Sequence, residues 1–424
     1  MKKLLVHYEG WGEHWLLGTL ADNGSELLFE YSAEALRQGL ELSPHQLKLQ
    51  VPAYGRFPAH LQRLPGLVAD ALPDGWGLLL MDRLFRKQGL NVAALSPLDR
   101  LAFLGQRAMG ALTFEPADER PVSTHDMKLL ELAQEAQVLS GGHNSTALRD
   151  LALLGGSPQG ARPKVLVQVH AATHAVICAD PYTDPYTDTH APNTAAPAGH
   201  APWLVKFPAH GEHKEVCAIE CLYAELARRC ALEVPQTHLF TLDRKLAAFG
   251  IARFDREGDK RVPVHTLAGA LHADFTRPGS VDYTTLLRAT RLFTQDEREV
   301  RKAFERAVFN VVFNNRDDHP KNFSFRLGPG RHWALAPCYD LTFAPGPRGE
   351  HSMDVCGEGQ ALTRPLLLQL AEQGGLGKAW AAKALARLAE VAGSFKALAA
   401  QWPIRQTTVA SMLKAVEANR ARLV

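Results

Sequence analysis

Residues 313–324, FNNRDDHPKNFS, follow directly on an apolar run with helical spacing. The apolar positions of that run recur three and four residues apart, which predicts one buried helix face that ends close to Asn314; they are Val300, Phe304, Ala307, Val308, Val311 and Val312. Thr294-Gln295-Asp296-Glu297 is expected to begin this helix as a capping box. The polar stretch is therefore predicted to form a loop at the end of a buried helix.

The loop contains the residue types that transfer of a phosphoryl group requires. Such transfer needs a carboxylate that orients or deprotonates the acceptor hydroxyl, and oxygen ligands for Mg²⁺. Asp317 is the candidate base, and Asn322 offers a carboxamide oxygen suited to a hard cation. Two predicted strands, FSFRL and WALAP, follow, and Asp340 comes soon after the second. A hairpin would return Asp340 to Asn322, so that the base and two metal ligands converge.

A simpler interpretation of this loop stays open, because Asn and Asp readily cap helices and form turns without any catalytic role. The motifs HRD and DFG are absent, which excludes an ordinary protein kinase. His319 and Lys321 lie between the proposed base and metal ligand, where their side chains would meet phosphate oxygens. Asp317 is preferred to Asp318 as the base because two adjacent loop residues usually point apart.

Composition limits the class of protein. With 424 residues and 46% apolar content, the chain can bury a large core spread over two or three subdomains. The net charge of +2 gives no global reason to expect nucleic acid or membrane as the main partner. No run approaches the ~18 apolar residues of a membrane span, so we expect a cytoplasmic protein. The six cysteines form no CxxC pair, which favours reduced, structural thiols.

The predicted organisation has three regions. Residues 1–118 begin with short strands at 3–8, 14–20 and 27–31 and continue as helices. Residues 140–250 alternate strands and helix and are the candidate nucleotide-binding lobe, while 251–424 are mostly helical. An insertion near 180–202 repeats PYTD and is rich in Pro, Ala and Thr. It is expected to be a mobile surface segment, with a tyrosine-rich recognition loop as the alternative.

Three further segments carry weaker patterns. Residues 155–164, GGSPQGARPK, form a glycine-bearing turn before a strand, which either aims backbone N–H groups at phosphates or is a plain turn. Lys206 lies in an apolar strand, where burying an unpaired ammonium costs free energy. Its side chain is therefore expected either to pair with Glu220 of the next helix or to reach solvent from an edge strand. Residues 253–256, RFDR, offer backbone groups to an adenine ring or form surface ion pairs.

The order of these motifs resembles that of the HipA family, the serine/threonine kinase toxins of bacterial toxin–antitoxin modules. The resemblance runs through most of the chain, in FEYSAEAL, ALPDGWG, LGQRAMGALTFEP, GARPK, WLVKFP, AIECLYAELA, ARFDR, RDDHPKNFS and LAPCYDL. It implies an α+β, two-lobed protein-kinase-like fold, distantly related to phosphoinositide-kinase-like kinases. The N-lobe would be small and mixed, the C-lobe mostly helical, and an extra β-rich subdomain would stand at the N-terminus.

The resemblance also implies roles for single residues. Asp317 would be the catalytic base, Asn322 and Asp340 would bind Mg²⁺, and the segment through Lys164 would be a phosphate loop. Ser157, just before that loop, would be the autophosphorylated serine. The ATP-binding set that the resemblance implies is Gln159, Gly160, Ala161, Arg162, Lys164, Lys206, Ala252, Arg253, Phe254, His319, Lys321, Asn322, Tyr339 and Asp340, with Glu220 as the ion-pair partner of Lys206.

The chain departs from the family pattern at a few positions. The family often has Gly-Ala-Gln before the loop lysine, whereas here Arg162 and Pro163 intervene, and Pro158 directly follows the candidate phosphorylation site. At the expected hinge the best-known members carry Glu where this chain has Ala252.

The resemblance implies partners as well. They are a small HipB-like DNA-binding antitoxin, DNA only through that antitoxin, and a protein substrate such as an aminoacyl-tRNA synthetase. Two other functions remain open. One is a catalytically silent nucleotide-binding subunit that assembles with its antitoxin through residues 1–115. The other is a metal-dependent nuclease, which the near-neutral net charge disfavours.

Overall fold

The structure is a computed structural model that describes residues 2–116, 128–178 and 197–423. The chain forms two compact units. Unit 1 contains Met1–Cys217 and His238–His265, and unit 2 contains Ala218–Thr237 and Thr266–Val424. The predicted domain boundaries stay predictions, and most of the predicted insertion near 180–202, namely residues 180–196, lies outside the described residues.

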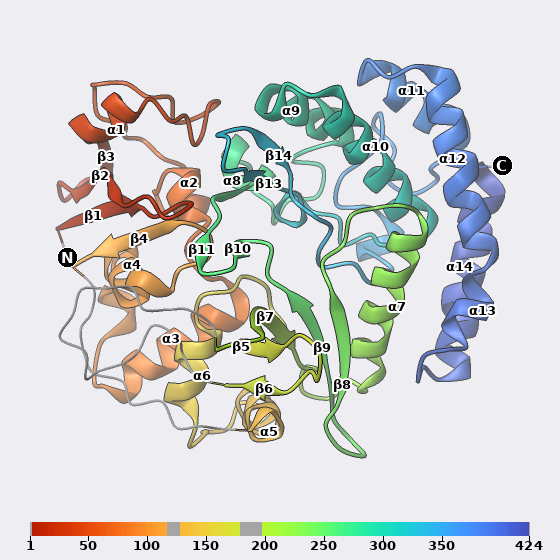
Figure 1. Ribbon diagram of the computed structural model, residues 1–424, viewed down its shortest axis with the longest axis horizontal. Helices are drawn as coiled ribbons and strands as arrows, with labels where there is room; N and C mark the ends of the chain where they lie inside the picture. Colours follow the sequence, from red (N-terminus) through yellow and green to blue (C-terminus); the bar gives the residue numbers. More distant parts are fainter. Residues whose placement is uncertain (1, 117–127, 179–196, 424) are drawn as a thin grey trace. The chain divides into compact units, whose positions relative to one another are not determined.

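The N-terminal part of unit 1 is built on a four-stranded sheet with the order β3-β2-β1-β4, shown in Figure 1. Its antiparallel strands are β1 (Lys3–Tyr8), β2 (Trp15–Asp22), β3 (Leu27–Tyr31) and β4 (Leu112–Glu115). Alternate residues of β1 are buried, as expected of a strand with one face on a core. The three strands predicted at the N-terminus are therefore confirmed.

Helices fill the chain between the third and fourth strands. They are α1 (Ala33–Gln38), α2 (Gly66–Ala69), α3 (Gly75–Lys87) and α4 (Pro97–Leu104), with single turns at η1 (Ala59–Leu61), η2 (Val92–Ala94) and η3 (Gly105–Arg107). A capping box of Ser96 and Asp99 begins α4, with proline at its first position. The buried side of α3, which includes Trp76 and Leu80, packs against a later helix, α6 (Leu148–Gly155).

A second, five-stranded sheet has the order β6-β5-β7-β9-β8. Its strands are β5 (Lys164–His170), β6 (Val176–Ile177), β7 (His200–Lys206), β8 (Thr237–Thr241) and β9 (Ala247–Ala252). Helix α6 packs on β5 and also on α5 (Leu129–Ser140). After β9 come the short strands β10 (Arg256–Glu257), β11 (Lys260–Arg261) and β12 (Val264–Thr266).

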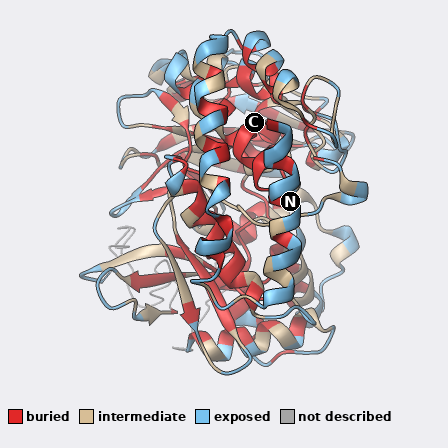
Figure 2. Cartoon of the chain, turned by 90° about the vertical axis from the view of Figure 1, so that its right-hand side faces the viewer, coloured by how far each residue is buried: buried red, intermediate tan, exposed pale blue. Residues whose placement is uncertain are grey.

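Unit 2 is mostly helical, and α10 (Glu297–Val312) packs against several other helices of the unit. The other helices of unit 2 are α8 (Leu267–Leu271), α9 (Tyr283–Thr294), α11 (Arg364–Gln373), α12 (Lys378–Gly393), α13 (Phe395–Ala399) and α14 (Gln406–Leu423), with single turns at η4 (Pro320–Asn322) and η5 (Pro347–Gly349). Helix α7 (Glu215–Arg229) begins in unit 1 and continues in unit 2. The helices near the C-terminus each have a buried and an exposed face (Figure 2).

The helix before the polar loop has the buried face that the sequence predicts, because Val300, Phe304 and Val308 are fully buried. Its start differs from the prediction. Thr294 is the last residue of α9, and its hydroxyl donates to the carbonyl of Thr290 at 2.8 Å. Asp296 caps α10 instead, since its carboxylate accepts from the N–H of Arg298 at 2.8 Å. The predicted capping box is therefore wrong, because α9 extends to Thr294 before the chain turns.

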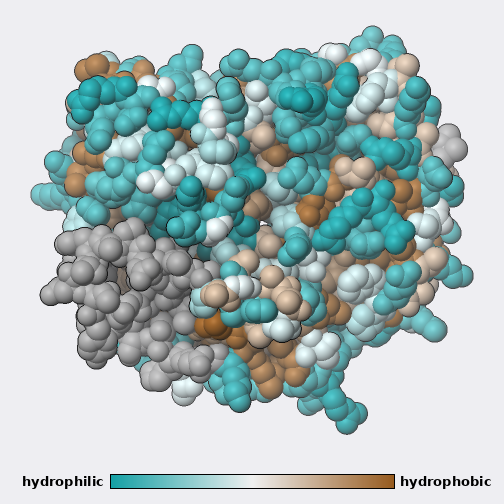
Figure 3. Space-filling model, viewed as in Figure 1, coloured by the Kyte–Doolittle hydropathy of each residue, from teal (hydrophilic) through white to brown (hydrophobic). Residues whose placement is uncertain are grey.

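The surface seen in Figure 3 mixes hydrophilic and hydrophobic residues. Among the described residues, the large hydrophobic side chains that are exposed are Val51, Leu90, Val138 and Leu292. No helix within the described part of the chain is long and apolar enough to cross a membrane. Five of the six cysteines are buried and Cys356 is half-buried, which agrees with the predicted packing of these side chains in the core; their reduced state stays a prediction.

Candidate active site

The polar loop of unit 2 presents Asp317 to solvent. The helix before it ends at Val312, and the chain turns through Asn314, whose φ of 56° lies in the left-handed region that asparagine tolerates. The side chain of Asn322 donates to the backbone carbonyl of Asp317 at 2.7 Å and so closes the loop. The Asp317 carboxylate is 62% exposed, with His319 Nε2 at 3.8 Å from Oδ1. A solvent-facing carboxylate on a closed loop can act as a base toward an incoming hydroxyl.

The residues predicted to bind Mg²⁺ have suitable chemistry. The amide nitrogen of Asn322 is used within the loop, which leaves the carboxamide oxygen as a possible ligand. The hydroxyl of Tyr339 contacts the backbone carbonyl of Lys321 at 2.6 Å, so the hairpin does return the chain to the loop. Asp340, the next residue, has φ of 54°, a conformation that non-glycine residues rarely adopt.

The number of protein ligands also fits this ion. Mg²⁺ takes one or two carboxylates and fills its remaining positions with water and phosphate oxygens. An amide oxygen and one carboxylate suit it better than they suit Zn²⁺, which prefers nitrogen and sulfur ligands. No group of three or more His, Cys, Asp or Glu side chains that could hold a metal occurs within residues 2–116, 128–178 and 197–423.

Phe275 contacts both residues that lie between the base and the metal ligand. The ammonium of Lys321 is 4.1 Å from the centre of the Phe275 ring, a cation–π distance. The ring of His319 packs on the same phenylalanine, with centroids 5.4 Å apart. Sequence reasoning missed Phe275, because it lies far from the loop in the sequence and belongs to no polar pattern.

Asp318 points the other way from its neighbour and is buried, with 1% of its surface exposed. Three groups donate to its carboxylate: the hydroxyl of Tyr283 at 2.5 Å, Nδ1 of His351 at 2.7 Å and the N–H of Ser352 at 2.8 Å. A buried carboxylate is tolerated when it is satisfied in this way. Burial, and then the charge of Asp318, raise the pKa of Tyr283 well above its ordinary value, so this hydroxyl stays a donor.

The hydrogen bonds of Asp318 continue into the helices beneath the loop. Asn310 of α10 donates to the Tyr283 hydroxyl at 3.0 Å, and Asn315 donates to Asn310 at 3.0 Å. The loop is thus tied to α9 and α10 through side chains as well as through the backbone. A small pocket lies there, lined by Leu232, Arg306, Phe309, Asn310, Asn315, Asp318, Asn322, Phe323, Cys338, Tyr339 and Leu341.

In unit 1, residues 155–164 form a tight loop before β5. Gly160 has φ of 102°, which suits glycine, and the ammonium of Lys164 donates to the carbonyl of Gln159 at 2.5 Å. Arg162 forms an ion pair with Glu212 at 3.0 Å. Ser157 is 2% exposed, and its hydroxyl has no hydrogen-bond partner among the described residues.

Two buried lysines stand opposite each other in the second sheet. Lys164 of β5 pairs with Lys206 of β7, and they are 3% and 8% exposed. Directly paired residues of an antiparallel ladder project from the same face, and like charges at such positions repel. Glu220, the predicted partner of Lys206, is buried and belongs to unit 2, so that ion pair stays a prediction.

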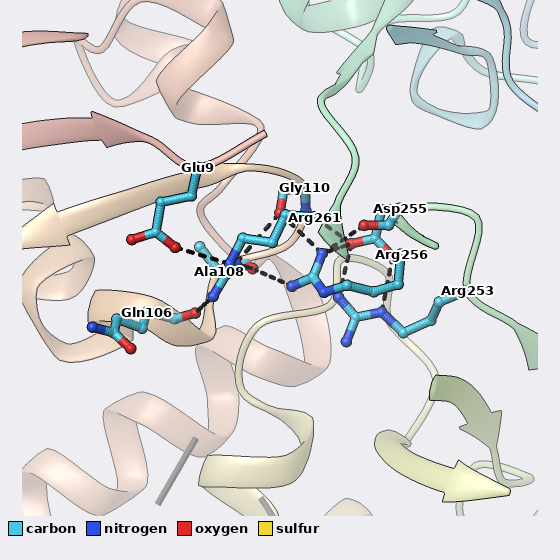
Figure 4. Close-up of polar contacts among 8 residues, drawn as sticks. All are labelled: Glu9, Gln106, Ala108, Gly110, Arg253, Asp255, Arg256 and Arg261. Carbon is cyan, nitrogen blue, oxygen red and sulfur yellow. Dashed lines mark hydrogen bonds and ion pairs between the residues drawn. The ribbon is translucent and has the colours of Figure 1, made fainter. Parts of the chain in front are cut away.

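The segment predicted as a hinge follows β9. Ala252 pairs with Trp203 in the ladder, and the N–H of Arg253 donates to the carbonyl of Pro202 at 2.9 Å. The guanidinium of Arg253 makes two hydrogen bonds to Asp255, at 2.8 and 2.7 Å (Figure 4). Both the backbone N–H and the side chain of Arg253 are therefore hydrogen-bonded to other residues of unit 1.

Asp255 is the centre of a buried ion cluster rather than of a surface one. Its carboxylate also binds Arg256 at 2.9 Å and the N–H of Gly110 at 2.8 Å, while Arg261 pairs with Glu9 at 3.1 Å (Figure 4). Burial opposes ionisation of Asp255, but the charges of Arg253 and Arg256 outweigh it and hold its pKa well below the ordinary value. This cluster joins the hinge segment to the N-terminal part of unit 1.

Comparison with protein families agrees with this arrangement. The HipA-like C-terminal domain matches residues 156–402, and the HipA N-terminal domain matches residues 9–115. The first match alone covers more than half of the chain. The protein therefore belongs to the HipA family, as the order of its motifs predicts.

Individual relatives are more distant. A putative kinase of Haemophilus influenzae is 26% identical over 155 residues, which are 33% of this chain and 45% of that protein, so the match spans less than half of the relative. The structure of Shewanella oneidensis MR-1 HipA with HipB and operator DNA has a TM-score of 0.69 at 17% identity, covering 99% of this chain and 96% of that chain. The Helicobacter pylori proinflammatory kinase CtkA has a TM-score of 0.40 at 13% identity, over 52% and 85%. The similarity to the Shewanella structure confirms the predicted α+β fold.

Proposed function

We propose that this protein is an ATP- and Mg²⁺-dependent serine/threonine protein kinase that acts as the growth-inhibiting toxin of a toxin–antitoxin module. The observation that carries the proposal is the loop of unit 2, in which Asn322 closes the backbone at Asp317 and leaves that carboxylate 62% exposed. Membership of the HipA family supports the same chemistry.

In this proposal Asp317 accepts the proton of a serine or threonine hydroxyl. The hydroxyl oxygen forms a bond to the γ-phosphorus of ATP as the bond to the oxygen of ADP breaks. Asn322 and Asp340 would hold Mg²⁺, which when bound neutralises charge on the phosphate oxygens. His319 and Lys321, beside Phe275, would lie along the nucleotide.

The lysines of unit 1 supply the proposed phosphate contacts. Lys164 and Lys206 face the same side of the sheet, which favours a ligand with several negative charges. The backbone of residues 159–162 would add N–H donors to the same phosphates. Ala252 and Phe254 would offer backbone groups to adenine, while Arg253 would act through its place in the cluster around Asp255.

Ser157 is the proposed site of autophosphorylation. Its hydroxyl is buried, so it can accept a phosphoryl group only after residues 155–164 leave their place. Mass spectrometry of protein incubated with ATP and Mg²⁺ tests this directly. Phosphate on Ser157 would support the proposal, and a phosphorylated protein without modification of Ser157 would refute this part of it.

The proposed partner is a small HipB-like DNA-binding antitoxin, through which the complex would reach DNA. The solved relative from Shewanella was crystallised with HipB and operator DNA, which motivates the expectation. The proposed substrate is a protein of translation, such as an aminoacyl-tRNA synthetase, in the cytoplasm.

The experiment that separates the candidate functions is ATP turnover with and without Mg²⁺. The kinase proposal requires Mg²⁺-dependent transfer of the γ-phosphoryl group to protein. ATP binding without transfer would instead support a silent regulatory subunit. Cleavage of nucleic acid without ATP would support a nuclease.

A further inference from the structure

The loop at residues 155–164 is held by the segment Asp70–Gly77 of the N-terminal module, here called the docking turn. We propose that Asp74 in the docking turn is a positioning residue, which fixes the phosphate loop in the conformation that binds ATP. The proposal rests on the proposed kinase function. It assigns to the N-terminal family domain a direct part in nucleotide affinity.

The peptide groups on both sides of Gly160 are clamped by the docking turn. The N–H of Gly160 donates to the carboxylate of Asp74, and the carbonyl of Gly160 accepts from the N–H of Trp76 at 3.0 Å. Gly160 has φ of 102°, a backbone conformation that glycine adopts readily and other residues rarely do. A hydrogen bond to a charged group is among the stronger kinds, and Asp74 makes it at this point.

The rest of the loop is held from the same side. The side-chain amide of Gln159 donates to the carbonyls of Asp70 and Leu72, each at 3.1 Å. The indole nitrogen of Trp76 donates to the carbonyl of Lys164 at 3.1 Å. The docking turn therefore fixes the loop before, at and after Gly160, including the lysine proposed to meet phosphate.

The docking turn is shaped to admit the loop. A Cβ added to Gly75 would lie 2.8 Å from the Cα of Ala161, and one added to Gly77 would lie 2.8 Å from the carbonyl oxygen of Gly156. Real Cβ atoms do not approach other atoms so closely, so both positions require glycine for this contact. The glycines of ALPDGWG thus have a physical explanation in the approach of the two backbones.

Side-chain contacts of Asp70 with the rest of unit 1 hold the docking turn in place. Asp70 Oδ2 lies 2.7 Å from Nδ1 of His265, and Nε2 of that imidazole lies 3.0 Å from the hydroxyl of Ser43. These three residues have the order of contacts of a hydrolytic triad, but Ser43 and His265 are fully buried and offer no access to a substrate. The contacts instead hold the backbone of Asp70, to which Gln159 is bonded.

The first test measures the loop without nucleotide. Hydrogen exchange of the peptide that covers residues 156–164 is compared in the wild type, Asp74→Ala and Asp74→Asn. We expect the Gly160 amide to exchange at least about 10-fold faster in Asp74→Ala, because the free energy of a hydrogen bond to a charged group corresponds to a factor of at least about 10 in the exchange rate. Asp74→Asn keeps an acceptor oxygen and should restore most of the protection. Glu30→Ala, a substitution of an exposed residue in the same module, is the control.

The second test measures affinity for ATP with Mg²⁺ by calorimetry, together with KM and kcat. We expect Asp74→Ala to raise Kd and KM for ATP by about 10-fold, with a smaller change in kcat. Gln159→Ala removes the hydrogen bonds from the loop to the carbonyls of Asp70 and Leu72 and should also raise Kd and KM for ATP. If Asp74→Ala does not fold, Gln159→Ala replaces it as the variant expected to lose affinity, and Asp74→Asn remains the variant expected to keep it.

The outcomes are distinguishable. Wild-type exchange in Asp74→Ala, or faster exchange with unchanged affinity for ATP, would overturn the positioning role while leaving the kinase proposal intact. If the wild type binds no ATP, the kinase proposal and the nucleotide part of this inference both fail. The exchange data then still decide whether the docking turn holds the loop.

Discussion

Nδ1 of His351 lies 2.7 Å from Oδ2 of Asp318, and both side chains are almost fully buried. The next carboxylate along the chain toward the N-terminus, Asp317, is 62% exposed. Two adjacent aspartates thus have opposite surroundings. One is a structural anchor of the loop, and the other is available for chemistry.

We predict that this difference appears in stability. Asp318→Ala leaves the hydroxyl of Tyr283, the imidazole of His351 and a backbone N–H without their acceptor, which should lower the free energy of unfolding by about 3 kcal/mol. Asp317→Ala changes an exposed side chain and should cost less than about 0.5 kcal/mol. Urea denaturation measures both, and equal losses in the two variants would contradict the assignment.

The ion cluster of Figure 4 predicts a dependence of stability on pH. The folded pKa of Asp255 is depressed, so its contribution to stability is fully present above the unfolded pKa, near 4, and is lost as the pH falls through the folded value. At neutral pH this contribution is on the order of 2 kcal/mol. Asp255→Asn should therefore be less stable than the wild type at pH 7 and should lose less stability between pH 5 and pH 3. Parallel unfolding curves over that range would contradict the prediction.

The paired lysines of the second sheet predict a specific loss of nucleotide binding. Lys206→Met should raise the Kd for ATP by about 10-fold or more, since it removes a buried cation opposite Lys164. Lys245→Met, an exposed change in unit 1, is the control and should bind ATP normally. Calorimetric titration measures both, and equal affinity in the two variants would remove Lys206 from the phosphate site.

Phe275 should influence the reaction through Lys321. Phe275→Leu removes the aromatic face 4.1 Å from the ammonium, and a contact of this kind contributes about 0.5–1 kcal/mol. We expect kcat/KM for ATP to fall about 3-fold in Phe275→Leu and to remain near the wild-type value in Phe275→Tyr, which keeps the ring. Equal values in the two variants would mean that the ring does not position the lysine.

Much of the fold could be predicted from local patterns. Buried and partly exposed residues alternate in the first three strands, and α10 has apolar residues at helical spacing. The spacing of the apolar residues therefore identifies each element as a strand or a helix. The start of α10 was missed because Thr294 belongs to the preceding helix. Aspartate and threonine are both common N-cap residues, and the end of α9 at Thr294 leaves Asp296 as the cap of α10.

The candidate site was predictable where its residues lie close together in the sequence. Asp317, Asn322 and Tyr339 are joined by short connections, and the structure brings their segments together. Asp318, Phe275 and the docking turn were not identified as parts of it. Their contacts join segments far apart in the chain. Residue type alone does not predict whether an aspartate is buried or exposed.

The most direct test of the central claim compares Asp317→Ala with a matched variant. Glu372→Ala removes another carboxylate of unit 2 that is equally exposed, at 62%. Both variants and the wild type are incubated with ATP labelled in the γ-phosphate and with Mg²⁺, and transfer of label to protein is measured. We predict transfer by the wild type and by Glu372→Ala, and a loss of at least about 1,000-fold in Asp317→Ala. Undiminished transfer by a folded Asp317→Ala variant would contradict the assignment of this loop as the catalytic centre.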